Sequence, residues 1–311
     1  MQQRLTVAQV LARFDREVGL EVTPRARVSA RADAFDAGVA PEAAELRAPS
    51  PRSFAGGTGT GAPIAPESRP APTRMPVVAP VAARPSATHA HAYPAAVLGP
   101  AGDSSARAAL LAEIEARHAS TCPHCTTATG HTQLVFGEGA ASAELMFVGE
   151  APGEAEDRTG RPFVGAAGEK LDEMIRAMGL RREDVYVANV LKSRPPDNRT
   201  PMPDEVAGCG PFLVEQILAV RPRAIVTLGG PATKFVCGVE TGISRLRGTW
   251  QTWTPPAGAS CEPIPVMPTY HPAYVLRTYT KQVRAEVWSD LRAALAKIGR
   301  RPPERATAVE A

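Results

Sequence analysis

Three polar side chains follow apolar runs of strand length in this sequence and are of types that could act together on one ligand. They are the carboxylate of Glu150, the amide of Asn189 and the imidazole of His271. Taken singly, each has a structural explanation: a charged surface loop, a residue that ends a strand, or a histidine that caps a loop. If the three runs are parallel strands of one sheet, their carboxyl ends meet at one edge, where open α/β sheets bind ligands. Their convergence therefore favours a functional site.

Two cysteines form a Cys-Pro-His-Cys sequence, Cys122 to Cys125, after a predicted helix. Two thiolates at this spacing can bind one metal centre, so the pair indicates half of a zinc or iron–sulfur site. A redox dithiol is disfavoured because the pair does not follow a strand. The chain has five cysteines, and we expect thiols and metal ligands rather than disulfides in a reducing compartment.

The elements that must position these side chains alternate between strands and helices. The predicted strands are 145–148, 184–190, 224–229 and 265–270, and the predicted helices are 108–117, 167–178, 203–220 and 283–298. Ser104 or Ser105 would cap the first helix, and Pro211 would break or kink the third. This alternation is typical of a doubly wound α/β domain with helices on both faces of a parallel sheet.

The composition separates a folded domain from a long amino-terminal extension. The chain has 31 prolines and 26 glycines, and much of the extension is too rich in small residues to bury the apolar surface that folding requires. We predict a short helix over 1–20, a disordered tether over 21–103, the domain over 104–300 and a disordered tail over 301–311.

Charge and hydropathy exclude some classes of protein and leave others open. A net charge of +3 is compatible with a nucleic-acid partner but does not specify one. No apolar run approaches the roughly 20 residues that span a bilayer, and the amino terminus lacks a signal-peptide core. We therefore expect a cytoplasmic protein with no membrane partner.

Six motifs occur in the order GEAPG (149–153), GRPFVG (160–165), NV with KSRPPDNR (189–199), TLG (227–229), LRG (246–248) and TYHPAYVLR (269–277). Together they resemble the family 4 uracil-DNA glycosylases, over residues 122–296. The resemblance implies a three-layer α/β/α sandwich around a central, mostly parallel four-stranded sheet. It also implies an enzyme that flips uracil out of DNA and hydrolyses its N-glycosidic bond, leaving an abasic site for base-excision repair.

The resemblance gives roles to the polar residues at the sheet edge. His271 would donate to uracil O2 as negative charge develops on the leaving base, and Asn189 would read O4 and N3–H. Phe163 would stack on the flipped base, and the backbone from Gly149 to Ala151 would line the pocket. Glu150 would orient water or help hold the base, since Ala151 stands where the best-known superfamily members have a water-positioning aspartate.

DNA contacts follow from the same resemblance. Extruding a base costs a few kcal/mol, and the superfamily places a wedge after the histidine motif to fill the vacated stack. The expected wedge is Val275 or Leu276, unless this run only starts the last helix, and the expected phosphate contacts are Arg194, Arg199, Arg247 and Arg277.

The metal site departs from the family pattern of four cysteines that bind a 4Fe–4S cluster. Cys122, Cys125 and Cys209 match, but the remaining position is Ser193. The alternatives are a cluster with serine oxygen or another fourth ligand, a weaker three-cysteine cluster, or zinc with His124 or His131. We favour a cluster of reduced stability that ties the amino-terminal segment to the 193–209 loop.

Other functions are also compatible with these residues. The chain could be a non-catalytic DNA-binding protein, or a polymerase-associated accessory protein, on the same fold. We expect a monomer that acts on uracil-containing DNA and binds a repair or replication partner through its tether.

Overall fold

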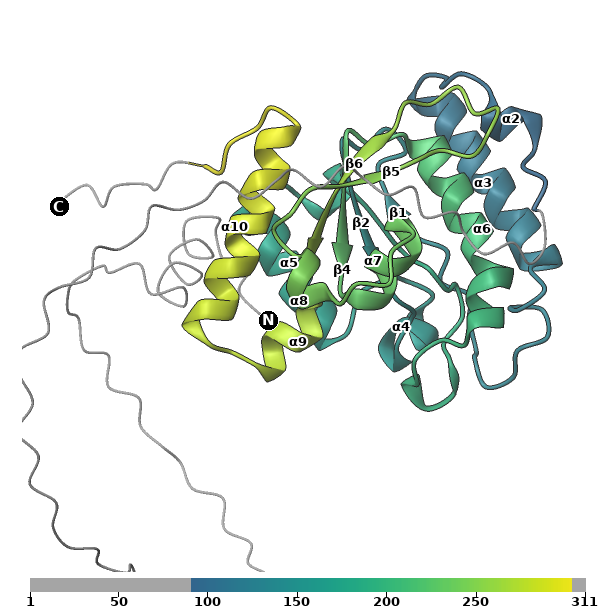
Figure 1. Cartoon of the computed structure of the whole chain (residues 1–311). Helices are drawn as coiled ribbons and strands as arrows, with labels where there is room; N and C mark the ends of the chain where they lie inside the picture. Colours follow the sequence, from purple (N-terminus) through teal and green to yellow (C-terminus); the bar gives the residue numbers. More distant parts are fainter. Residues whose placement is uncertain (1–90, 304–311) are drawn as a thin grey trace, which may run out of the picture. The chain divides into compact units, whose positions relative to one another are not determined.

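The computed structural model describes residues 91–303, in which helices flank a central sheet (Figure 1). Its elements are, in chain order, α2 (Ala95–Leu98), α3 (Ser104–Thr121), β1 (Glu138–Gly139), β2 (Leu145–Gly149), α4 (Glu154–Thr159), α5 (Ala166–Ala177), η1 (Arg182–Asp184), β3 (Tyr186–Asn189), η2 (Pro196–Asn198), α6 (Pro203–Val220), β4 (Ala224–Leu228), α7 (Gly230–Cys237), α8 (Ile243–Leu246), β5 (Gln251–Trp253), β6 (Ile264–Thr269), α9 (Pro272–Arg277) and α10 (Lys281–Lys297). The predicted helix over 1–20, the tether up to residue 90 and the tail from residue 304 lie outside the described residues. No helix within 91–303 is long and apolar enough to cross a membrane.

The sheet confirms the predicted α/β class and adds two edge strands. Its six strands run in the order β1-β3-β2-β4-β6-β5. The four central strands, β3, β2, β4 and β6, are parallel and correspond to the predicted four-stranded sheet. The edge strands β1 and β5 pair antiparallel to their neighbours.

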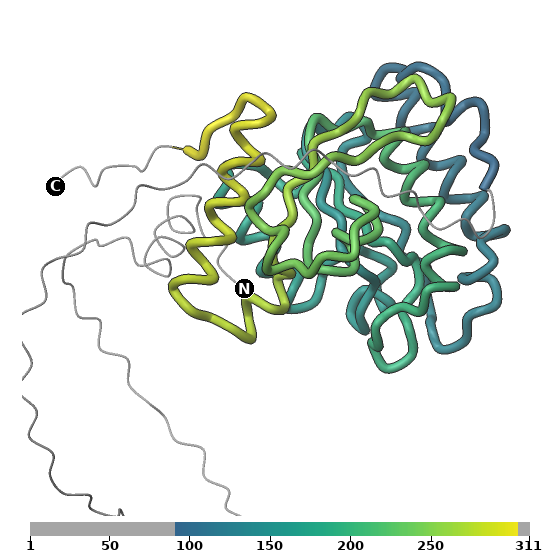
Figure 2. The backbone as a smooth tube through the Cα atoms, viewed as in Figure 1, coloured from purple at the N-terminus to yellow at the C-terminus, as the bar shows by residue number. Residues whose placement is uncertain are grey.

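Helices cover both faces of the sheet because the central strands are apolar on both sides. Leu145 and Phe147 of β2 face the layer of α5, α9 and α10, whereas Met146 and Val148 face the layer of α2, α3, α6 and α7. Figure 1 shows α5 and α10 on one side of the strands and α3 and α6 on the other. Helices α3 and α6 pack side by side, as the backbone trace in Figure 2 also shows. Helix α6 continues through Pro211 without the predicted break.

The segment before α3 belongs to the folded domain, so the predicted boundary at residue 104 is wrong. Val97 of α2 is buried, and His91 Nε2 lies 2.9 Å from Oε1 of the buried Glu215 on α6. The side chain of Asp103, rather than Ser104 or Ser105, caps α3 by accepting a hydrogen bond of 2.9 Å from the Ala106 amide. The sequence prediction missed this docking because its contacts are made with residues far along the chain.

Candidate active site

The turns after β2 and β3 are joined at the carboxyl edge of the sheet. Gly149 and Asn189 are register partners at the ends of these neighbouring strands. Beyond them, the Val190 amide donates to the Gly149 carbonyl at 3.0 Å, and the Leu191 amide donates to the Glu150 carbonyl at 3.1 Å. These bonds fix the backbone that carries Glu150 beside the backbone that carries Asn189.

Gly149 allows two of the predicted site side chains to approach the backbone. A Cβ atom at this position would overlap both Asn189 Oδ1 and the ring of Phe163. Only glycine therefore fits between them. The amide of Asn189 and the ring of Phe163 meet over the same short stretch of β2.

The side chain of Asn189 carries an unpaired acceptor in a buried position. The residue is 1% exposed, and its Oδ1 has no hydrogen-bond partner among residues 91–303. Buried polar atoms are normally paired, so an orphaned acceptor points to a missing donor from a ligand or water. The main chain of Asn189 is held in place, because the Lys192 ammonium donates to its carbonyl at 2.6 Å.

Phe163 adopts a backbone conformation that non-glycine residues rarely take, with φ of 50°. The carboxylate of Glu156 stabilises the turn that follows by accepting hydrogen bonds from the amides of Val164 at 2.8 Å and Gly165 at 3.0 Å. Glu156 also accepts from the Gly153 amide at 3.1 Å. The half-buried carboxylate of Glu156 thus joins the Phe163 turn to the turn after β2.

His271 completes this group of side chains. Its ring centroid lies 5.7 Å from that of Phe163, with 33° between the planes. His271 Nδ1 accepts a hydrogen bond of 3.1 Å from the Ala273 amide, so the neutral ring carries its hydrogen on Nε2. Burial lowers the pKa of His271 to about 4, and the nearby Arg277 adds to this effect. At neutral pH the ring is an uncharged donor through Nε2.

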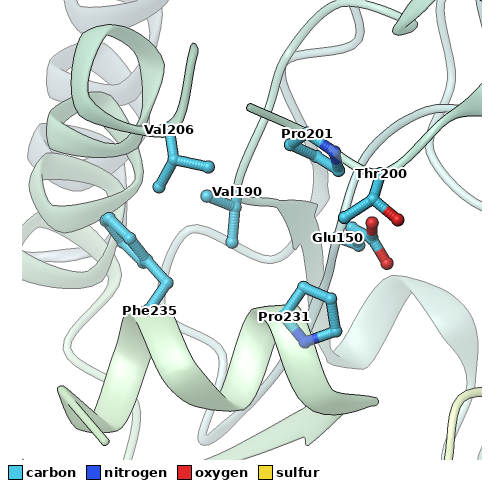
Figure 3. A pocket seen from close by; sticks show the side chains of 7 residues that line it. All are labelled: Glu150, Val190, Thr200, Pro201, Val206, Pro231 and Phe235. Carbon is cyan, nitrogen blue, oxygen red and sulfur yellow. The ribbon is translucent and has the colours of Figure 1, made fainter. Parts of the chain in front are cut away.

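Glu150 is half-buried at the start of the same turn, and burial raises the pKa of its carboxyl group. The residue lines a small cavity of about 50 Å³ together with Val190, Thr200, Pro201, Val206, Pro231 and Phe235. Figure 3 shows its carboxylate beside Thr200, at one end of a largely apolar space. Among the described residues, Phe163, Asn189 and His271 do not line this cavity. Glu150 therefore borders the group on the side of α6 and α7.

The four arginines expected to contact phosphate are in different environments. Arg194 is half-buried and donates to Asn198 Oδ1 at 2.8 Å. Arg277 is exposed. Arg199 forms an ion pair with Glu205 but keeps 41% of its side chain exposed. Arg247 contradicts the expectation, because its guanidinium pairs at 2.6 Å with Asp290, which is 1% exposed. Arg247 is a structural residue.

The two wedge candidates are separated by the orientation of α9. Val275 is 3% exposed and packs in the core with α5 and α10, so it cannot enter DNA and that alternative is wrong. Leu276 is 40% exposed on the same helix. The helix therefore presents Leu276 and the neighbouring Arg277 to solvent near His271.

The cysteines gather as predicted, and a histidine that the sequence prediction missed joins them. Ligand atoms of His118, Cys122, Cys125 and Cys209 all lie within 4.8 Å of one another, and all four residues are buried. The Sγ atoms of Cys125 and Cys209 are 3.6 Å apart. Hydrogen bonds from the other two thiols lower the pKa of Cys122, which favours the thiolate that binds metals. The group is positioned to bind a metal.

Ser193 lies directly beside this group, with His124 next to it, whereas no described contact joins His131 to it. Ser193 Oγ accepts from the Cys125 thiol at 3.3 Å and lies 3.1 Å from His124 Nε2. His131 is not part of the group. His118 could have been found from its position four residues before Cys122, on the same face of one helix.

A buried lysine connects the metal-binding group to Asn189. The Lys192 amide donates to Cys209 Sγ at 3.2 Å, and its ammonium donates to the Asn189 carbonyl and, at 2.5 Å, to Gln216 Oε1. Burial lowers the pKa of Lys192 to about 8. The loop after β3 therefore belongs to both sites.

Comparisons with known proteins agree with this arrangement. A family model of the uracil DNA glycosylase superfamily matches residues 136–292. The chain is 45% identical over 185 residues to a type-4 uracil-DNA glycosylase of Thermotoga maritima, covering 59% of this chain and 93% of that protein. It is 44% identical over 194 residues to one from Archaeoglobus fulgidus, covering 60% and 93%, and 45% identical over 161 residues to one from Sulfurisphaera tokodaii, covering 50% and 71%. The chain therefore belongs to the uracil-DNA glycosylase superfamily and, within it, to the type-4 family.

Proposed function

We propose that this protein is a uracil-DNA glycosylase, which flips uracil out of DNA and hydrolyses its N-glycosidic bond in base-excision repair. The observation that carries the proposal is the buried, unpaired Oδ1 of Asn189, next to Gly149, Phe163 and His271. Uracil presents an N3–H donor beside the O4 acceptor. A fixed amide can pair with both, whereas cytosine offers the opposite pattern and would leave the amide unpaired. The ring of Phe163 would stack on the base.

His271 would stabilise the leaving group. Cleavage of the glycosidic bond moves negative charge onto the uracil oxygens and positive charge onto the sugar. A neutral His271, with its hydrogen on Nε2, would donate to O2 and gain strength as charge develops there. The low pKa of His271 supports a neutral ring, in which Nδ1 accepts from the Ala273 amide and Nε2 keeps the hydrogen that O2 would receive.

Glu150 would act on the sugar or the attacking water rather than on the leaving base. It directly follows Gly149 at the end of β2, and its carboxylate would orient the attacking water or stabilise the positive sugar. Its partly buried position raises its pKa and strengthens its interaction with a developing positive charge. The apolar walls of the neighbouring cavity would keep bulk water away from this carboxylate.

DNA would lie across the exposed ends of these loops. Leu276 would enter the duplex as the wedge, and Arg194, Arg199 and Arg277 would contact phosphates. Arg199, whose side chain is 41% exposed, would exchange its ion pair with Glu205 for a phosphate.

Cys122, Cys125 and Cys209 would hold a 4Fe–4S cluster, with zinc as the alternative metal. The soft thiolates of these three residues and their burial fit such a group. When bound, the group would cross-link the end of α3 to α6, and the loop after β3 contacts it through the Lys192 amide, which donates to Cys209 Sγ. Because the Lys192 ammonium in this loop also donates to the Asn189 carbonyl, the metal would support the position of Asn189 in base recognition.

The cellular setting follows from this activity. We propose a monomer that works in the cytoplasm on uracil-containing DNA, with a repair or replication partner recruited by the amino-terminal extension.

The test is release of uracil from oligonucleotides. Full-length protein is incubated with single- and double-stranded DNA containing one uracil, and alkali-labile abasic sites are measured against matched DNA containing cytosine or thymine. We expect cleavage at uracil alone, and a loss of roughly 100- to 1,000-fold for His271→Ala, the cost of removing one donor to a developing oxyanion. Asn189→Ala should lose activity and uracil binding together. Wild-type protein that binds uracil-containing DNA but releases no base would instead identify a DNA-binding protein.

A further inference from the structure

We infer that His118 is the fourth protein ligand of the metal site, in place of the cysteine that Ser193 replaces. The site would then contain three thiolates and one imidazole. This inference rests on the proposed metal cofactor, but not on uracil excision, because it concerns the ligands alone.

The helix α3 places His118 for this role. His118 and Cys122 are four residues apart, and the Cys122 amide bonds to the His118 carbonyl at 3.0 Å, so the helical turn between them is complete. Side chains with this spacing lie on the same face of a helix. The Nε2 atom of His118 is 3.7 Å from Cys209 Sγ, which comes from α6 on the other side of the group.

The environment of His118 is otherwise unexplained. The residue is fully buried, its ring packs edge-on against Phe212 at 4.8 Å, and its Nδ1 has no partner among the described residues. Among the described residues, the polar contacts of its ring are with sulfur atoms of the metal-binding group, Cys122 and Cys209. Thiol sulfur is a weak hydrogen-bond partner for a buried imidazole, and a bond from Nε2 to a metal would replace these weak contacts with a strong one.

Ser193 is less suited to binding the metal directly. Its hydroxyl already interacts with Cys125 Sγ at 3.3 Å and with His124 Nε2 at 3.1 Å. A hydroxyl must lose a proton of high pKa to become an anionic ligand, and iron–sulfur clusters favour soft thiolate ligands over hard oxygen ligands. Imidazole binds in its neutral form and replaces cysteine on iron in Rieske centres. Ser193 would instead donate a hydrogen bond to the Cys125 thiolate.

This ligand set changes the charge of the site. Three thiols lose their protons on metal binding, whereas neutral His118 releases none. The site therefore carries one negative charge fewer than a four-cysteine site. Replacing thiolate by imidazole raises the reduction potential of an iron–sulfur centre.

Spectroscopy on full-length protein purified without oxygen tests the inference. The protein is labelled with 15N-histidine, reduced, and examined for nitrogen hyperfine coupling to the cluster by pulsed EPR. We expect coupling in wild-type protein, in Ser193→Ala and in His124→Ala, and its loss in His118→Cys, which should retain iron at a lower reduction potential. In His118→Ala, release of iron to a chelator should be about tenfold faster or more.

Three results would overturn the inference: no histidine coupling in the wild type, coupling that persists in His118→Cys, or loss of iron from Ser193→Ala but not from His118→Ala. If wild-type protein holds zinc rather than iron and sulfide, the proposed cluster fails. The ligand question is then decided by zinc affinity, which should fall at least about tenfold in His118→Ala and stay unchanged in Ser193→Ala. Protein that binds neither metal contradicts both.

Discussion

Gly149 and Asn189 end neighbouring parallel strands as register partners, and the amide oxygen of Asn189 occupies the space that a side chain at position 149 would need. Gly149→Ala should therefore displace the Asn189 amide, the Phe163 ring or both. We expect a fall of roughly 100-fold or more in kcat/KM for uracil release, since positioning errors of about 1 Å have effects of this size.

The matched control for this substitution is Gly230→Ala, because a Cβ at Gly230 meets no atom within 4 Å. It should leave both activity and Tm close to wild type. Full activity in Gly149→Ala would show that the contact between Gly149 and Asn189 does not set the geometry of the site.

The pKa of His271, lowered to about 4 by burial, predicts how activity and stability depend on pH. The neutral ring predominates above that value, so the contribution of His271 to kcat/KM should be constant from about pH 5.5 to 8 and should fall below pH 4. The unfolded chain takes up this proton near pH 6.5, before the folded chain does. Stability is therefore lost as pH falls from about 6.5 to 4, by about 3 kcal/mol in total. Urea unfolding at pH 7 and pH 4 measures this loss, which should be smaller in His271→Gln.

The different exposure of Val275 and Leu276 predicts different defects from adjacent substitutions. Leu276→Ala should reduce uracil release from duplex DNA more than from single strands, because only the duplex has a stack to fill. Val275→Ala should cost about 1–3 kcal/mol of stability through loss of core packing. Comparing the rates on both substrates with Tm separates the two effects. Equal losses on duplex and single strands in Leu276→Ala would exclude a wedge.

Arg199 and Arg247 should also respond differently. Arg199→Ala should weaken DNA binding and reduce the slope of log Kd against log salt concentration by about 1, as expected for one phosphate contact. Arg247→Ala should instead destabilise the fold by about 3–5 kcal/mol, because it leaves the buried Asp290 without its charge partner. Salt titrations of DNA binding and chemical unfolding of both variants provide the measurements. A salt slope unchanged in Arg199→Ala would remove it from the interface.

Lys192 predicts coupling between the metal-binding group and base recognition. Lys192→Met keeps most of the side-chain volume but removes the donor to the carbonyl of Asn189 and to Gln216. We expect a loss of about 1–3 kcal/mol in stability and a lower kcat/KM for uracil release. Lys234→Met, on an exposed lysine paired with the exposed Glu240, is the control and should change neither. Wild-type kinetics in Lys192→Met would mean that the ammonium does not support Asn189.

The sequence was sufficient to predict the four central strands, because each is an apolar run that reads as buried on both faces. The edge strand β1 has two residues and β5 has three, too few to show any periodicity. Arg247 and Asp290 are 43 residues apart, so no local pattern reveals that they pair. The predicted helix end at residue 117 left His118 outside α3, although the helix continues to Thr121 and carries His118 beside Cys122.

The docking of residues 91–103 has a consequence for shortening the chain. Glu215 is fully buried, and its carboxylate is shared between His91 and Arg117. A chain trimmed to begin at residue 104 would remove His91 and Val97, open the surface of α6 to water and leave Arg117 as the sole remaining described partner of that carboxylate. Trimming for crystal growth should therefore stop before residue 91.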